Sequence, residues 1–365
     1  MTVLFACGGT AGHINPALAI ADIVKRNEPN TKILFAGTPN GMENRLVPAA
    51  GYEIRHIPIN PFRRSLSPEN LRAGASLFRS FRAARKLLDE STPSLVVGTG
   101  GYVCYPVLRV AASRGIPVVL HESNAKAGMA AKALARKTDL ALVGFPGASK
   151  DFAASKKTVV SGNPLRGEFY NLTRKRARRE LLLSDSHIYL VAFGGSLGAA
   201  SINRALEGTV PRLLARFPTL VILHVVGEKQ GKGLNEREQM GRYRRRAYVN
   251  DLPRHLIAAD FALCRSGAMT VSEIAAAGVP SVLIPYPDAS GDHQTKNAKA
   301  YADAGAAVLL PDRDLSPDRL FTLLSEYLND PAKRKEMKEK LHPFAFQDTE
   351  RIILRELKLL LSDNS

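Results

Sequence analysis

Short apolar runs alternate with helix-like stretches along the first half of the chain. The apolar runs are VLFAC at 3–7, KILFAGT at 32–38, SLVVGTG at 94–100 and PVVLHES at 117–123. Between them, apolar residues recur at helical spacing over 15–27, 70–90 and 105–115. Because strands separated by helices are typical of βαβ units, this half is predicted to form a doubly wound parallel sheet.

The same pattern restarts in the second half of the chain. HIYLVAFGGSLGAASINRAL at 187–206 repeats the strand, glycine turn and helix of VLFACGGTAGHINPALAIA at 3–21, and further apolar runs follow at 219–227, 259–264 and 280–287. We therefore expect an α/β fold of two Rossmann-like, doubly wound domains. Ligands of such sheets bind beyond the carboxyl ends of the strands, so both glycine turns are expected to line a cleft between the domains.

The expected boundary lies near Ser161–Arg166, where Gly162 and Pro164 interrupt the pattern. This gives a first domain over residues 1–163 and a second over 164–345. An amphipathic stretch at the C-terminus, within 346–365, is expected to join the first domain.

Composition narrows the class of protein. A chain of 365 residues exceeds what one hydrophobic core usually organises. Cys7, Cys104 and Cys264 are too far apart to suggest a disulfide framework or a zinc site, and they fit a reducing cytosol. No apolar run approaches the roughly 18 residues of a membrane span, and no charged segment precedes the first run. We expect a protein inside the cell that does not span a membrane.

Charge points to a polyanion. Lys plus Arg number 51 against 34 Asp plus Glu, a formal net charge of +17. Nucleic acid, an anionic membrane and phosphorylated substrates all attract such a chain, and we expect no nucleic-acid partner because no known binding module is present. Over residues 60–88 arginines, among them Arg63, Arg64, Arg72, Arg79, Arg82 and Arg85, surround Phe78 and Phe81. This stretch fits an anionic membrane surface, or else a core-packed helix with a solvated basic rim.

Three glycine clusters follow apolar strands. A strand that enters a helix through glycines presents backbone N–H groups to an anion, so Gly8, Gly9 and Gly12, and likewise 194–198 with the Ser196 hydroxyl, suit phosphate. Each turn alone is equally compatible with a βα connection that binds nothing, but two matched copies favour the ligand. Neither is a GxGxxG, and no acidic residue ends the following strand, which disfavours a nicotinamide enzyme. GTGGY at 98–102 is expected to line the same cleft.

Four polar positions are candidates for chemistry. His13, near a helix start that favours a neutral imidazole, is a candidate general base, or else a phosphate donor or helix cap. Glu273, in a helix predicted to begin around Thr270, either compensates the helix dipole or holds a ribose. Arg166 either reaches a pyrophosphate or is a solvated linker residue. The Asp-x-Asp of 312–314 is interpreted as a capping turn, so no metal site is expected.

Seven ordered motifs resemble the MurG family of bacterial cell-wall N-acetylglucosaminyltransferases. They are GGTAGHINPALA, GTGGYVCYP, LHESNAKAG, GNPLR, GGSLGA, CRSGAMTVSEIAAAGVP and DHQTKNA, and they extend from the first strand to about Ala307. The resemblance implies a GT-B fold and inverting transfer of N-acetylglucosamine from UDP-GlcNAc to the 4-hydroxyl of the muramoyl sugar of lipid I, which gives lipid II. It also implies a peripheral enzyme at the cytoplasmic face of the inner membrane, with no cofactor.

The resemblance assigns roles to matching positions. It places UDP-GlcNAc against Thr10, Ala11, Gly12, Asn124, Arg166, Ser196 and Gln294, with Glu273 on the ribose and the backbone near Val249 on the uracil. Gly100, Gly101 and Tyr102 would serve the acceptor side, and His13 is the favoured base over Tyr102 and Glu122. Ala11 replaces a glycine of the family's GGTGGH, which is tolerable if its φ is negative. A GT-B diacylglycerol glycosyltransferase and a non-catalytic sugar-nucleotide binder are the alternatives.

Overall fold

The computed structural model describes residues 1–59, 69–195, 198–228, 230–231 and 241–363, with the side chains of 69–75 and 290 left out. The chain divides into two compact units, one of residues 1–164 with 348–365 and the other of residues 165–347. Each unit is described by itself.

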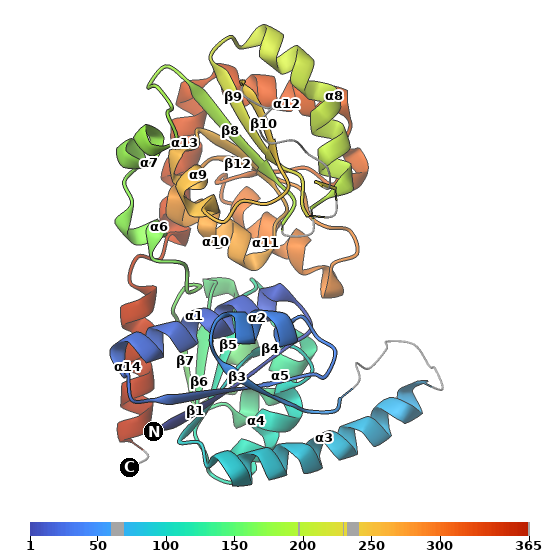
Figure 1. The fold of residues 1–365 in the computed structure, drawn as a ribbon, viewed down its shortest axis with the longest axis vertical. Coiled ribbons are helices and arrows are strands. Elements are labelled where there is room, and N and C mark those ends of the chain that lie inside the picture. The colour runs from blue at the N-terminus through green and yellow to red at the C-terminus, as the bar shows by residue number, and fades with distance from the viewer. Residues whose placement is uncertain (60–68, 196–197, 229, 232–240, 364–365) are drawn as a thin grey trace. The chain divides into compact units, whose positions relative to one another are not determined.

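The first unit is built on a parallel sheet. In its described part the strands run in the order β3-β2-β1-β4-β5-β6-β7 (Figure 1). Their bounds are β1 Thr2–Cys7, β2 Lys32–Gly37, β3 Glu53–His56, β4 Leu95–Gly100, β5 Val118–Glu122, β6 Leu140–Val143 and β7 Lys157–Val160. The helices are α1 Ala11–Asn27, α2 Glu43–Ala49, α3 Glu69–Ser91, α4 Cys104–Ser113, α5 Met129–Leu134 and α14 Thr349–Ser362, with short 3-10 turns η1 Ala135–Lys137 and η2 Pro146–Phe152.

Alternation along β1 explains why this sheet is covered on both faces. Val3 and Phe5 point into one core, while Leu4 and Ala6 point into the other. The first core is closed by α1, α2 and α14, and the second by α3, α4 and α5 (Figure 1). A parallel strand that is buried on both faces reads as a continuous apolar run, which is the pattern of VLFAC.

The C-terminal helix α14 packs on the first unit. Ile353 and Leu357 are buried in the same core as α1. The buried carboxylate of Glu356 accepts a 2.5 Å hydrogen bond from Lys157 of β7. Apolar contact and an ion pair thus join this last helix to the opening sheet.

The second unit repeats the architecture. Its described strands run in the parallel order β10-β9-β8-β11-β12-β13. Their bounds are β8 Ile188–Phe193, β9 Leu220–Val225, β10 Tyr243–Arg246, β11 Phe261–Cys264, β12 Ser281–Leu283 and β13 Val308–Leu309. The helices are α6 Glu168–Asn171, α7 Arg174–Glu180, α8 Ala200–Arg216, α9 Leu252–Ala258, α10 Ala268–Ala277, α11 His293–Ala302, α12 Pro317–Asn329 and α13 Pro331–Leu341, with 3-10 turns η4 Ser290–Asp292, η5 Asp312–Asp314 and η6 His342–Phe344. The predicted fold class is confirmed.

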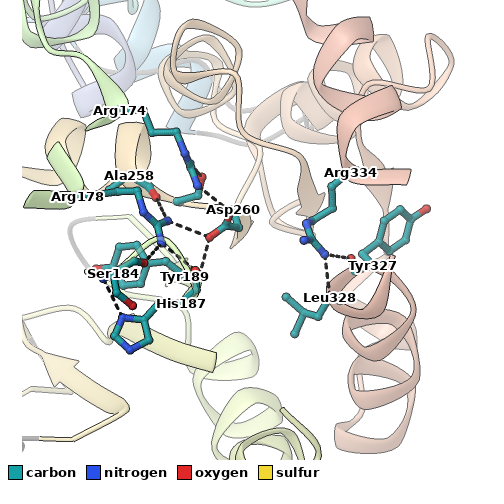
Figure 2. A network of polar contacts seen from close by, with 11 residues as sticks. Arg174, Arg178, Ser184, His187, Tyr189, Ala258, Asp260, Tyr327, Leu328 and Arg334 are labelled. Carbon is teal, nitrogen blue, oxygen red and sulfur yellow. Dashed lines mark hydrogen bonds and ion pairs between the residues drawn. The ribbon is translucent and has the colours of Figure 1, made fainter. Parts of the chain in front are cut away.

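Two arginines of α7 anchor this helix to the second unit (Figure 2). The Asp260 carboxylate accepts hydrogen bonds from Arg174 at 2.7 Å, from Arg178 at 3.1 Å and from the Tyr189 amide at 2.8 Å. The buried Arg178 guanidinium also donates to three backbone carbonyls, those of Ala258, Ser184 and His187. Because a buried charge is costly unless it is fully hydrogen-bonded, these contacts are structural. Part of the basic stretch 174–179 therefore serves the fold.

Candidate functional site

The turn between β1 and α1 leaves a helix N-terminus open to an anion. Gly9 has φ +88°, a conformation that favours glycine. Thr10 is the N-cap of α1, its side chain makes no capping hydrogen bond, and the first turn of the helix holds no acidic residue. Ala11 begins the helix and is not among the described non-glycine residues with positive φ, so its methyl group fits the turn. The Gly9 and His13 amides are bonded to Glu43 and to the Thr10 carbonyl, so the amides of Ala11 and Gly12 are the N–H groups that this helix end offers to a phosphate.

His13 is held between two glycines. Its Nδ1 lies 3.1 Å from the Gly8 carbonyl oxygen, and its ring lies against Gly100, where a Cβ would come within 2.4 Å of His13 Cδ2. Thr99 Oγ1 donates to the His13 carbonyl at 2.7 Å. Thr10 Oγ1 lies 3.4 Å from the same Nδ1. Because the Gly8 carbonyl can only accept, whereas a hydroxyl can also accept, a proton on Nδ1 satisfies both contacts and leaves Nε2 with the lone pair of a neutral ring. The arrangement suits a proton acceptor.

The third glycine cluster packs on the first. Gly100 and Gly101 have φ +116° and +86°, and a Cβ on Gly101 would lie 2.3 Å from the Gly8 oxygen. A Cβ on Gly9 would lie 3.7 Å from Tyr102 Cε1. The structure therefore brings the predicted acceptor-side residues against the turn that carries His13.

Glu122 and Asn124 form a closed pair at the end of β5. Glu122 Oε1 accepts from the Asn124 amide and side-chain nitrogen, both at 2.9 Å, and its Oε2 accepts from the Gly128 amide at 3.2 Å. Burial raises the pKa of the Glu122 carboxyl, against these hydrogen bonds and the nearby charge of His13. Asn124, predicted to contact UDP-GlcNAc, is thus held in place by hydrogen bonds within this loop.

The described residues of the second glycine turn share one feature with the first, a positive φ at the second glycine, Gly9 and Gly195. Gly195 and Gly198 have φ +91° and +78°, and a Cβ on Gly198 would lie 2.0 Å from the Val226 oxygen. Helix α8 has no side-chain cap and no acidic residue in its first turn. Ser196, the predicted hydroxyl donor of this turn, lies outside the described residues.

Arg166 and Glu273 lie near one another in the second unit. Helix α10 begins at Ala268, two residues before the predicted Thr270, so Glu273 stands in the second turn rather than the first. Burial raises the pKa of the Glu273 carboxyl to about 7, against the opposing charge of Arg166. Arg166 also donates to the Asn250 carbonyl at 2.8 Å, next to Val249. The predicted pyrophosphate, ribose and uracil positions are therefore grouped.

Gln294 is fixed at the start of α11. Its Oε1 accepts from the Tyr286 amide at 2.9 Å and from the Ser266 amide at 3.3 Å. Ser266 Oγ donates to the Gln294 carbonyl at 2.8 Å. Because the oxygen is taken by backbone donors, this assignment of the amide directs the NH₂ group elsewhere and gives Gln294 a donor for a ligand.

The Asp-x-Asp at 312–314 is engaged by protein groups. Asp312 accepts from Arg265 at 2.5 Å and from Ser201 Oγ at 2.7 Å. The capping interpretation is wrong in detail, since Ser316 is the N-cap of α12 and accepts from the Arg319 amide, whereas η5 has no side-chain cap. No group of three or more metal-ligating side chains occurs within the described ranges.

The two phenylalanines of the basic helix α3 differ in exposure. Phe78 is 74% exposed, and Arg79 and Arg82 are exposed as well. Phe81, expected to be exposed, is half-buried and meets the Tyr105 ring edge-on at 6.1 Å. Arg63 and Arg64 lie outside the described residues, as does the side chain of Arg72. Across the described part of the chain, none of the helices combines the length and apolar character of a membrane span.

Glu43 is a buried carboxylate of the first unit that the sequence pattern did not single out. It begins α2, six residues beyond the end of β2 at Gly37. Its side chain turns back to the Gly9 amide at 3.2 Å, which places it beneath the turn and not at a ribose. The sequence offered one signal for this buried carboxylate, an acidic residue shortly after the glycine-containing segments GT at 37–38 and NG at 40–41.

Family models cover most of the chain. Residues 3–143 match the N-terminal domain of glycosyltransferase family 28, and residues 189–352 match the C-terminal domain of the same family. The chain belongs to glycosyltransferase family 28. In the described part of the chain, strands β1–β6 correspond to the matched N-terminal domain and β8–β13 to the matched C-terminal domain, while β7 lies between the two matches.

Relatives within family 28 confirm the resemblance to MurG. A UDP-N-acetylglucosamine--N-acetylmuramyl-(pentapeptide) pyrophosphoryl-undecaprenol N-acetylglucosamine transferase of Acetivibrio thermocellus is 40% identical over 361 residues, 96% of each chain. A transferase of the same name from Desulforudis audaxviator is 39% identical over 93% of each chain. The crystal structure of Acinetobacter baumannii MurG matches with a TM-score of 0.78 at 29% identity, covering 98% of this chain and 99% of that one.

Proposed function

We propose that this family 28 enzyme transfers N-acetylglucosamine from UDP-GlcNAc to the 4-hydroxyl of the muramoyl unit of lipid I, which forms lipid II for peptidoglycan. The observation that carries this proposal is the 40% identity, over 96% of both chains, to a transferase whose name states this donor and acceptor. The diacylglycerol glycosyltransferase and the non-catalytic binder are not favoured, because the similar full-length relatives share the transferase name.

The donor is assigned mainly to the second unit. The open N-terminus of α8 and the Arg166 guanidinium would meet the pyrophosphate. Glu273 would accept the ribose hydroxyls, the backbone near Val249 would bind the uracil, and the Gln294 NH₂ group would donate to the sugar. Together with Ser196, these roles follow from the motifs and are supported by the grouping of the described residues.

The acceptor is assigned to the first unit. The turn at 8–12 and the cluster of Gly100, Gly101 and Tyr102 would bind its pyrophosphate, with Thr10, Ala11 and Gly12 also near the donor sugar. His13 Nε2 would take the proton of the 4-hydroxyl as that oxygen bonds to the anomeric carbon. The bond from this carbon to the UDP oxygen breaks on the opposite face, so one displacement inverts the configuration.

Two further properties belong to the same proposal. Helix N-termini and Arg166 would stabilise the charge of the departing UDP, so the transfer is proposed to need no metal. The exposed Phe78 with Arg79 and Arg82 is proposed to hold the enzyme at an anionic membrane surface, where lipid I resides. No nucleic acid is proposed as a partner.

The decisive experiment incubates the purified protein with radiolabelled UDP-GlcNAc and either lipid I or diacylglycerol, with and without EDTA. Labelled lipid II that forms equally in both EDTA conditions is the expected result. Label in diacylglycerol alone would assign the other acceptor, and a loss of activity in EDTA that Mg²⁺ restores would refute metal independence. Absence of any transfer together with UDP-GlcNAc binding would favour the binder.

A further inference from the structure

The carboxylate of Glu43 is fully buried in the first unit. Its Oε1 accepts from the Thr38 amide at 2.8 Å and from Thr38 Oγ1 at 2.6 Å, and its Oε2 accepts from the Gly9 amide at 3.2 Å. Burial alone would raise the pKa of this carboxyl, but the hydrogen bonds from Thr38 and Gly9 outweigh it and lower the pKa. Glu43 is therefore a fixed negative charge at neutral pH.

Three glycines form the cavity that holds this carboxylate. A Cβ would lie 2.7 Å from Glu43 Oε1 if placed on Gly8, 2.6 Å from Glu43 Cγ if placed on Gly37, and 2.1 Å from Glu43 Oε2 if placed on Gly41. Gly8 directly follows β1, Gly37 ends β2 and Gly41 lies in the loop before α2. Because these three positions have no side chain, there is space for the Glu43 carboxylate directly beneath the β1–α1 turn.

One peptide group connects Glu43 to His13. The N–H of Gly9 donates to Glu43, and the C=O of Gly8, which belongs to the same peptide group, accepts from His13 Nδ1 at 3.1 Å. Hydrogen bonds in a chain polarise one another, so an anion on the N–H side makes the carbonyl oxygen a stronger acceptor.

We propose that Glu43 is a positioning residue for His13 and acts through the Gly8–Gly9 peptide group. The proposal rests on the proposed role of His13 as base. The charge of Glu43 holds the imidazole proton on Nδ1, keeps the lone pair on Nε2, and stabilises the imidazolium that forms when Nε2 takes the acceptor proton. Glu43 itself stays ionised throughout. In Ser-His-Asp triads a carboxylate does this by direct contact, whereas here a peptide group lies between.

The test measures the imidazole tautomer by ¹⁵N NMR of histidine-labelled protein near pH ~9, where imidazoles are neutral. The His13 signals are assigned by their loss in His13→Ala. The parent is expected to carry the proton on Nδ1, and Glu43→Gln is expected to move population toward the Nε2–H tautomer. Its kcat for lipid I is expected to fall on the order of 10-fold, with the KM for UDP-GlcNAc within about twofold of the parent value.

Thr38→Val is the matched control, because it removes a buried hydrogen bond to the same carboxylate but retains its charge and the Gly9 contact. It is expected to lower the melting temperature without a change of tautomer. A folded Glu43→Gln with the ¹⁵N signature of the parent overturns the proposal, as does an equal tautomer change in Thr38→Val. A proton on Nε2 in the parent overturns it even if Glu43→Gln does not fold. Full turnover in His13→Ala would instead remove the proposed base and leave the tautomer result standing.

Discussion

The imidazole of His13 lies directly against the α-carbon of Gly100, where a methyl group would come within 2.4 Å of His13 Cδ2. The two residues belong to different βα connections, since His13 is in α1 and Gly100 ends β4. The absence of a side chain at Gly100 therefore sets the position of the proposed base.

Gly100→Ala is expected to displace His13 and reduce kcat for lipid I by roughly 10²-fold, the lower end of what a general base contributes. The positive φ adds about 1–3 kcal/mol of strain to the folded state. Gly51→Ala is the matched control, because Gly51 has φ +83° but open space around its Cβ position. Equal losses of kcat in the two variants, at equal melting temperatures, would show that contact with His13 does not matter.

His13→Ala is expected to reduce kcat by roughly 10²- to 10⁴-fold while the Kd for UDP-GlcNAc changes little, because the proposed donor contacts lie mainly in the second unit. Isothermal titration with UDP-GlcNAc and lipid I turnover on the same preparation separate the two effects. Turnover at the parent rate would exclude His13 as the base. Weaker binding of UDP-GlcNAc with an unchanged kcat at saturation would instead make His13 a donor-binding residue.

The sequence predicted the fold class because the buried strands β1, β2, β4, β5, β8, β9, β11 and β12 coincide with apolar runs. The strands β3 and β10, with the sequences EIRH and YRRR, have no apolar run and were not predicted. The residues of VLFAC face two cores in alternation, and because both faces are buried the whole segment is apolar. The glycine clusters were also predicted from the sequence, since Gly9, Gly100 and Gly198 have positive φ in or beside the connections that follow β1, β4 and β8.

The burial of individual side chains such as Glu43 and Phe81 could not be predicted from the sequence. Glu43 reaches Gly9 across 34 residues, and the cavity that holds it is made by glycines of three segments, so no local pattern shows its inward direction. Phe81 has the same basic neighbours as Phe78, yet its burial depends on Tyr105 of another helix. Such contacts become visible only when the segments are packed together.

Phe78→Ser is expected to weaken association with vesicles of anionic phospholipid and to leave the free energy of unfolding within about 0.5 kcal/mol of the parent value, because Phe78 is 74% exposed. Phe81→Ser is expected to cost about 1–3 kcal/mol of stability, because its half-buried ring packs on Tyr105. Vesicle sedimentation and urea unfolding distinguish the two. Undiminished sedimentation of folded Phe78→Ser would remove α3 from the proposed membrane surface.

Glu273 is expected to make stability depend on pH. Burial raises the pKa of this carboxyl from 4.5 to about 7, so the folded state binds its proton more tightly than the unfolded state does. The stabilisation is complete below pH 4.5 and is lost as the pH rises through about 7, at a cost of about 3 kcal/mol. Glu273→Gln cannot ionise, so its unfolding free energy relative to the parent should increase between pH 4.5 and 8.

The same variant tests the ribose assignment. Two ribose hydroxyls donate best to an ionised carboxylate, so the parent should bind UDP-GlcNAc more tightly as the pH rises through about 7, whereas Glu273→Gln should bind weakly with little pH dependence. Glu168→Gln, at an exposed position of α6 in the same unit, is the control. If Glu273→Gln keeps the affinity of the parent at pH 8 while its stability changes as expected, the raised pKa belongs to the fold and another group holds the ribose.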